Sequence, residues 1–253
     1  MPVVGGHIVC SIAELDAVGD ALELDLRRFP FTMGHGGATI EERVALVEAV
    51  HRDLAARDLV RGAEFAPALV ERLRLFAEAP LGIALVGTVR DAPLVARAAS
   101  DGRDGVLAVQ RGDVIAFHRH SSDTVVRALV DLLPDLRPGP GSSVVVTAPP
   151  PRRPDEDFSQ FRFTSGVRPA ATAGSAAAEM MRRPRTGAGH FSATTLNGHR
   201  EVESGAFTYL DTEAGRYAIL PGVDSDGRPN ATCTPVDHRY LERRLRALIN
   251  LTE

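Results

Sequence analysis

The stretch from Leu81 to His120 constrains the fold of this chain more than any other part of the sequence. Four apolar, strand-like runs follow one another there with only a few turn residues between them: LGIALVGTV, PLVARAA, GVLAVQ and DVIAFHRH. The intervening turn residues are Arg90-Asp91, Asp101-Gly102 and Arg111-Gly112-Asp113. Strands joined by so few residues pair in the antiparallel sense, so the sequence predicts an antiparallel meander.

A second block of strands lies in the C-terminal part of the chain, and a helical pattern follows each block. The runs of the second block are HFSATTL, GAFTYLD, GRYAILP and NATCTP. After the first block, Ser121 or Ser122 is expected to cap a helix with the inward residues Val126, Leu129, Val130 and Leu133. After the second block, Pro235 is expected to begin a helix with the inward residues Leu241, Leu245, Leu248 and Ile249.

Strands followed by a helix thus occur at 81–134 and again at 189–250. The predicted fold class is therefore α+β, with an antiparallel sheet flanked by helical bundles and a pseudo-twofold arrangement of two halves. Helical periodicity also predicts helices at 12–24, at about 39–57 and between Gly62 and Pro80. In the second of these, the expected apolar face consists of Val44, Val47, Val50 and Leu54.

Changes in composition give the expected boundaries within one compact domain. Residues 1–148 form an N-terminal half, 149–187 a linker, and 188–253 a C-terminal half. The linker begins with PPPRRPDEDFSQFRF, which has little apolar surface to bury, so residues 150–168 are expected to be mobile. An Ala-rich stretch predicts a weak helix at about 170–183.

Composition excludes several functional classes. All 29 basic residues are Arg, and without Lys the chain has neither a Walker A loop nor an amine for Schiff-base chemistry. A net charge of −4 argues against a nucleic-acid-binding domain. The apolar runs are too short to insert into a membrane, and the N-terminus lacks the pattern of a signal peptide, so a cytoplasmic protein is expected.

The candidate catalytic residues are few. His118 and His120 lie two apart on a predicted strand and so share a face, but no further metal ligand lies at a suitable spacing. His35 in GHGGAT fits a flexible loop, and Cys10 and Cys233 fit small buried side chains.

The hairpin FTYLDTEAGRYAILP contains an acid, Asp211, which is interpreted as a turn former because no partner is evident. In the same turn Gly215 is expected to supply a positive φ. No catalytic, cofactor or metal site is therefore predicted. An enzyme that uses His118, His120 and Asp211 in a cleft between the halves is the less favoured alternative.

Three groups of motifs, taken in order, resemble the EspG family of actinobacterial type VII secretion chaperones. They are SIAELDAV, then ALVDLLPDLRPGPGSSVVV, then GAGHFSATTL with FTYLDTEAGRYAILP. The resemblance implies a cytosolic, non-enzymatic protein with two quasi-symmetric halves. It also implies a partner, the apolar tip of a helical PPE protein within a PE–PPE pair. The remaining alternative is a scaffold or regulator with a different partner, and weak self-association is compatible with the sequence.

The resemblance further implies that the loop after the first strand of the meander contacts the partner. In this chain the loop consists of Val89, Arg90, Asp91, Ala92 and Pro93. The later strands around Phe207 and Tyr209 are expected to offer a further exposed face. The chain departs from the family where PPPRRPDEDFSQFRFTSGV replaces a Leu-rich helix, and its loop at 90–93 is short.

Overall fold

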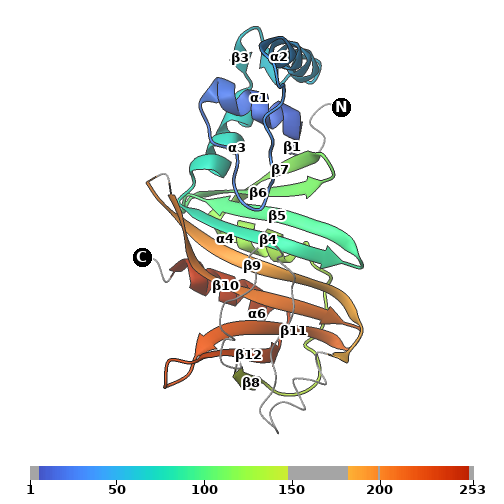
Figure 1. Cartoon of the computed structure of the whole chain (residues 1–253), viewed down its shortest axis with the longest axis vertical. Coiled ribbons are helices and arrows are strands. Elements are labelled where there is room, and N and C mark those ends of the chain that lie inside the picture. Colours follow the sequence, from blue (N-terminus) through green and yellow to red (C-terminus); the bar gives the residue numbers. More distant parts are fainter. Residues whose placement is uncertain (1–5, 148–181, 199, 251–253) are drawn as a thin grey trace.

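A ten-stranded antiparallel sheet runs through the whole computed structural model, which describes residues 6–147, 182–198 and 200–250 (Figure 1). Its strand order is β1-β7-β6-β5-β4-β9-β10-β11-β12-β8. The strands are β1 (His7–Ser11), β4 (Leu81–Val89), β5 (Ala92–Ser100), β6 (Asp104–Arg111), β7 (Val114–Ser121), β8 (Val144–Thr147), β9 (Arg185–Asn197), β10 (Arg200–Thr212), β11 (Gly215–Val223) and β12 (Pro229–Pro235). The predicted α+β class and the predicted meander, β4 to β7, are confirmed.

The seam at the middle of the sheet joins two long strands from distant parts of the sequence. β4 pairs with β9 along its whole length, with Leu85 opposite Phe191. Outward from this seam the order is β4, β5, β6, β7 on one side and β9, β10, β11, β12 on the other. Each series is followed directly by a helix, and β8 lies between α4 and β9 in the sequence. The same order of four strands and a helix on each side of the seam is consistent with two related halves. That the halves superimpose by a pseudo-twofold rotation stays a prediction.

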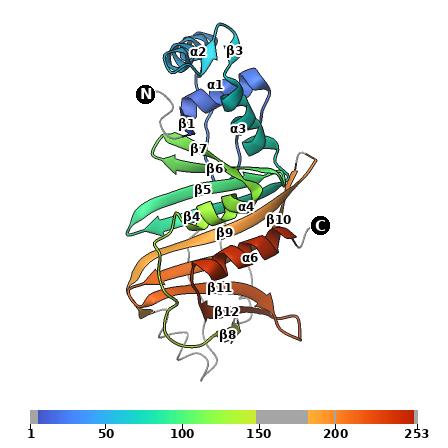
Figure 2. The ribbon, with the colours of Figure 1, turned by 180° about the vertical axis from the view of Figure 1, so that it is seen from behind.

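Two helices, α4 (Ser122–Val130) and α6 (His238–Asn250), cover the same face of the sheet (Figure 2). α4 packs on β5, β6 and β7, and α6 packs on β9 and β10. The core beneath them has its apolar side chains on both sides of the seam, including Leu85, Phe191 and Phe207. The inward residues expected on these helices are buried, except Ile249, which is half-buried. We call this side of the sheet the helix-covered face.

The N-terminal helices lie at one end of the molecule, and the second core lies where they meet the opposite face (Figure 1). They are α1 (Ile12–Leu22), α2 (Ile40–Ala55) and α3 (Pro67–Glu78), with a small hairpin of β2 (Val60–Arg61) and β3 (Glu64–Phe65). Capping boxes begin two of them, Ser11 with Glu14 in α1 and Thr39 with Glu42 in α2. The sequence predicted these starts.

The apolar face expected on α2 is only partly buried. Val50 and Leu54 belong to the core and Leu46 packs against it, whereas Val44 and Val47 are 53% and 44% exposed. The loop before α2, expected to be flexible, is held by the buried Asp16, which accepts a 3.0 Å hydrogen bond from the Gly36 N–H. Asp16 also pairs with Arg27 and Arg43.

Two boundaries differ from the expected ones. The closing helix begins at His238, because Pro235 still pairs with β11 and the carboxylate of Asp237 accepts a hydrogen bond from the Tyr240 N–H at 2.8 Å. β9 begins at Arg185, inside the expected linker, because Val89 and Thr212 provide pairing partners there. The stretch expected to be mobile, 150–168, and most of the weak helix at 170–183 lie outside the described residues. The division into 1–148, 149–187 and 188–253 stays a prediction.

Candidate partner-binding surface

Asp211 at the end of β10 is a buried partner of Arg216 and not a turn cap. The side chains of Asp211 and Arg216 are 2% and 0% exposed. Arg216 donates from Nε to one carboxylate oxygen at 2.5 Å and from Nη2 to the other at 2.8 Å. The expectation that Asp211 has no partner is therefore wrong. The turn is instead capped by Thr212, whose Oγ1 accepts from the Ala214 N–H and donates to the Gly215 carbonyl.

This ion pair ties the hairpin to the segment after α4. Arg216 also donates to the Pro134 carbonyl at 2.9 Å, and the Tyr217 hydroxyl donates to the Pro140 carbonyl at the same distance. A Cβ on Gly139 would lie 2.1 Å from the Tyr217 ring, so only glycine fits there. The sequence motifs LLPDLRPGPG and LDTEAGRY are thus the two sides of one packed unit. Since Arg216 neutralises Asp211 and both side chains are buried, the unit is structural.

The hairpin tip from Val89 to Pro93 is a tight turn rather than a long loop. Arg90 and Asp91 both have positive φ, 48° and 64°, which is the backbone of a two-residue hairpin turn. The Arg90 N–H donates to the Thr186 carbonyl of β9 at 2.7 Å, so a third strand supports the tip. Ala92 and Pro93 are exposed and Val89 is half-buried. The tip therefore presents a short, fixed surface.

Next to the tip, the sheet face opposite the helix-covered face carries a row of residues from neighbouring strands. Register places Val86, His190, Thr208 and Ile219 side by side on β4, β9, β10 and β11. Val86 is 37% exposed and the other three are half-buried. Figure 1 shows no helix of the described residues in front of β9, β10 and β11. We call these four residues the sheet row.

The sheet row has a mixed apolar and polar character. His190 Nδ1 lies 3.5 Å from the Thr208 hydroxyl, and burial holds the pKa of His190 below its ordinary value, although Glu203 acts in the opposite sense. An uncharged imidazole between Val86 and Thr208 suits contact with an apolar partner. Sequence analysis missed these residues. Their alternation with the buried Leu85, Phe191, Phe207 and Ala218 was the signal that could have found them.

Phe207 and Tyr209, expected near an exposed face, lie instead in the core. They are 1% and 0% exposed, and both rings contact Phe191, with ring centroids 5.2 and 5.7 Å away. They point toward the helix-covered face, where α6 packs on β10. Their side chains therefore belong to the core, and the residue between them that lies on the opposite face is the half-buried Thr208.

His118 and His120 share a face of β7, as expected, next to the edge strand β1. The ring of His118 stacks on His7 of β1, with 5.0 Å between centroids. Burial lowers the pKa of both His118 and His120. Within residues 6–147, 182–198 and 200–250, no group of three or more His, Cys, Asp or Glu side chains could hold a metal ion. Asp211 lies in the other half of the molecule, so the structure does not bring the three residues of the alternative enzyme site together.

Burial also raises the pKa of the two thiols, to about 12 for Cys10. Both cysteines are buried, as expected. Among the helices that the structure describes, none is long and apolar enough to cross a membrane.

Comparison with known proteins identifies the family of the chain and a solved structure with a similar fold. The model of the EspG family matches residues 11–247, and the comparison with curated proteins gives no match. One similar solved structure is that of the Mycobacterium tuberculosis type VII secretion system chaperone EspG5 in complex with a PE25–PPE41 dimer. It has a TM-score of 0.63 at 15% identity, over 96% of each chain, a likeness that concerns the fold. Because the family model covers nearly the whole sequence, the chain belongs to the EspG family.

Proposed function

We propose that this protein is a cytoplasmic, non-enzymatic chaperone that binds a helical PE/PPE-type substrate of a type VII secretion system and keeps it soluble. The observation that carries the proposal is the family match over residues 11–247, supported by a fold shared with a chaperone solved in complex with such a pair. A helical substrate with an exposed apolar tip would aggregate unless another surface covered it. Covering such a tip requires shape and apolar contact and no catalytic group.

The surface that supports this role combines the hairpin tip and the sheet row. The tip exposes Ala92 and Pro93 at the end of the β4–β5 hairpin, and the row begins at Val86, on the same hairpin. Both parts are held by backbone pairing, so binding requires little ordering of the chaperone. Arg90, at the rim, adds a positive charge that can attract an acidic partner at long range.

The test introduces a charge at the tip. Ala92→Asp places a carboxylate in a contact that excludes water, so affinity should fall by about 2 kcal/mol or more, roughly thirtyfold. Titration calorimetry against a purified PE–PPE pair measures the effect, and melting curves confirm the fold. Ala45→Asp, an exposed alanine on α2 at the far end of the molecule, is the matched control and should leave affinity unchanged.

Arg90→Glu should act differently from Ala92→Asp. As a rim charge, it should mainly slow association and change its dependence on salt, as measured by stopped-flow mixing. If neither variant alters binding while both remain folded, the contact lies away from the tip. Failure of the wild-type protein to bind any such pair would overturn the proposed function itself.

A further inference from the structure

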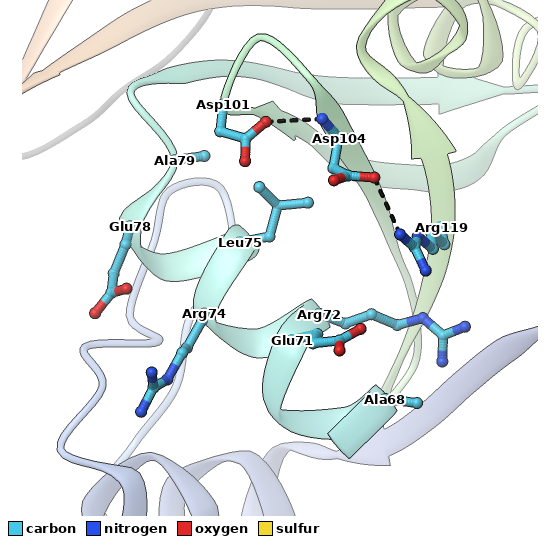
Figure 3. A pocket seen from close by; sticks show the side chains of 11 residues that line it. Ala68, Glu71, Arg72, Arg74, Leu75, Glu78, Ala79, Asp101, Asp104 and Arg119 are labelled. Carbon is cyan, nitrogen blue, oxygen red and sulfur yellow. Dashed lines mark hydrogen bonds and ion pairs between the residues drawn. The ribbon is translucent and has the colours of Figure 1, made fainter. Parts of the chain in front are cut away.

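A hollow of about 620 Å³ lies between α3 and the strands β6 and β7, away from the hairpin tip and the sheet row (Figure 3). One face of α3 lines it, with Ala68, Arg72, Leu75 and Ala79 at spacings of four, three and four residues. Across the hollow lie Gly105 and, from β7, Arg119. The short side chains of Ala68 and Ala79 leave space on the α3 side of the hollow, and Leu75 provides an apolar floor.

The two arginines come from opposite walls and lie on the same side of the hollow (Figure 3). Arg119 pairs with Asp104 at 3.1 Å, a mostly exposed contact that water weakens. Among the described residues, Arg72 donates only to the Gly6 carbonyl, at 2.8 Å, and its buried Nε finds no hydrogen-bond partner there. In the described part of the chain no carboxylate forms an ion pair with Arg72. Burial and the nearby charge of Arg119 lower the pKa of Arg72, and the charge of the neighbouring Glu71 offsets only part of this effect.

The acidic residues of the hollow do not remove this imbalance. Glu71 raises the pKa of Arg72, but among the described residues it forms no ion pair with it. Asp101 accepts hydrogen bonds from the Arg103 and Asp104 N–H groups of its own turn, and Asp104 is the partner of Arg119. Glu78 lies at the opposite side of the hollow from Arg72 and Arg119 (Figure 3). The two sides of the hollow therefore differ in charge, and the available hydrogen-bond donors lie on the side of Arg72 and Arg119.

We propose that this hollow binds a carboxylate attached to an apolar group, with the carboxylate between Arg72 and Arg119 and the apolar group against Leu75. Guanidinium groups bind carboxylates with paired, charge-assisted hydrogen bonds, and two guanidinium groups on one side of the hollow can both donate to one anion. The chemistry fits a peptide, either through its C-terminal carboxylate or through an acidic side chain beside an apolar residue. The site lies apart from the surface assigned to the secretion substrate and does not depend on that assignment.

The experiment uses three small probes on the full-length, ¹⁵N-labelled protein, followed by chemical-shift changes of the amides of α3 and β6. N-acetyl-leucine carries a C-terminal carboxylate, N-acetyl-glutamic acid α-amide carries only a side-chain carboxylate, and N-acetyl-leucine amide carries none. We expect saturable shifts with a Kd on the order of 1–10 mM for a carboxylate probe and none for the leucine amide, because so small a ligand offers few contacts. Binding of the first probe identifies a chain terminus as the source, and binding of the second identifies an acidic side chain.

Variants connect the shifts to the arginines. Arg72→Gln and Arg119→Gln should each weaken binding about tenfold, since each removes one charge-assisted contact. Arg74→Gln makes the same charge change on the same helix, but its side chain points away from the pair in Figure 3, so binding should persist. Because Arg119 is 60% exposed, its replacement leaves the fold intact even if loss of Arg72 loosens the Gly6 contact. Equal binding of acid and amide, shifts confined to another surface, or full binding by both Arg72→Gln and Arg119→Gln would overturn the proposal.

Discussion

At the scale of single residues, Asp211 owes its role to the register of one hairpin. A two-residue turn pairs Thr212 with Gly215 and so places Asp211 directly opposite Arg216. The sequence predicted the hairpin and the positive φ of Gly215, which is 134°, because both depend on neighbours in the chain. It did not predict the ion pair, because spacing alone does not show that both side chains point into the protein. Burial, and not the turn, decides what Asp211 does.

This burial makes Asp211→Asn a sensitive substitution. It leaves the Arg216 charge in the core with no compensating carboxylate, and should lower the free energy of unfolding by about 3–5 kcal/mol. Urea unfolding followed by circular dichroism measures the loss. Asp135→Asn is the matched control, because Asp135 is 98% exposed beside the same unit, and should change stability by less than about 0.5 kcal/mol. An Asp211→Asn protein as stable as the wild type would show that the pair contributes nothing.

At the scale of helices and strands, periodicity predicted most elements. It failed to predict which faces of these elements are buried and which stay exposed. The capping boxes of α1 and α2 and the turns of the meander involve residues close in sequence, so their prediction succeeded. Val44 and Val47 follow a helical apolar pattern, yet nothing in the described structure covers them. The sheet row was missed for a related reason, since both faces of β9 and β10 are rich in apolar and small residues.

Three half-buried histidines, His118, His120 and His190, make the stability of the protein depend on pH. The pKa of His118 is lowered by burial and then by His7 and other neighbouring cations, and burial lowers the pKa of His120 and His190 as well. The unfolded state, with ordinary pKa values near 6.5, therefore binds more protons as the pH falls. The contribution of these groups is fully present above about pH 6.5 and is lost on acidification, so the free energy of unfolding should fall between pH 7.5 and 5.5.

Histidine variants separate this effect from general acid sensitivity. His118→Gln keeps a polar side chain that cannot be protonated, so the decrease in stability between pH 7.5 and 5.5 should become smaller. His51→Gln, at an exposed histidine on α2, should retain the full decrease. Urea titrations at both pH values give two free energies of unfolding for each variant, which are compared with the two of the wild type. An unchanged decrease in His118→Gln would rule out His118 as a source of the pH dependence.

At the scale of the whole molecule, the seam between β4 and β9 joins the two sets of hairpins that local sequence patterns could predict. The hairpins β4–β5, β5–β6, β6–β7 and β10–β11 follow from short turns, whereas the pairing of β4 with β9 joins residues about a hundred positions apart. No sequence pattern specifies such a pairing, so the single continuous sheet emerged only from the structure. The hairpin tip was assigned from family resemblance, and the seam explains its rigidity, because β9 supports it through Thr186.

If the seam makes the two halves one cooperative unit, damage at its centre should weaken both. Leu85 is fully buried opposite Phe191 and packs in the core shared by α4 and α6. Leu85→Ala should cost about 2–5 kcal/mol, because it removes buried methyl groups and leaves a cavity. Native-state hydrogen exchange should then show an equal loss of protection in β6 and in β11, on opposite sides of the seam. Val145→Ala, at an exposed residue of the edge strand β8, should leave both strands unchanged. A loss confined to β6 would instead indicate two halves that unfold independently and merely share hydrogen bonds.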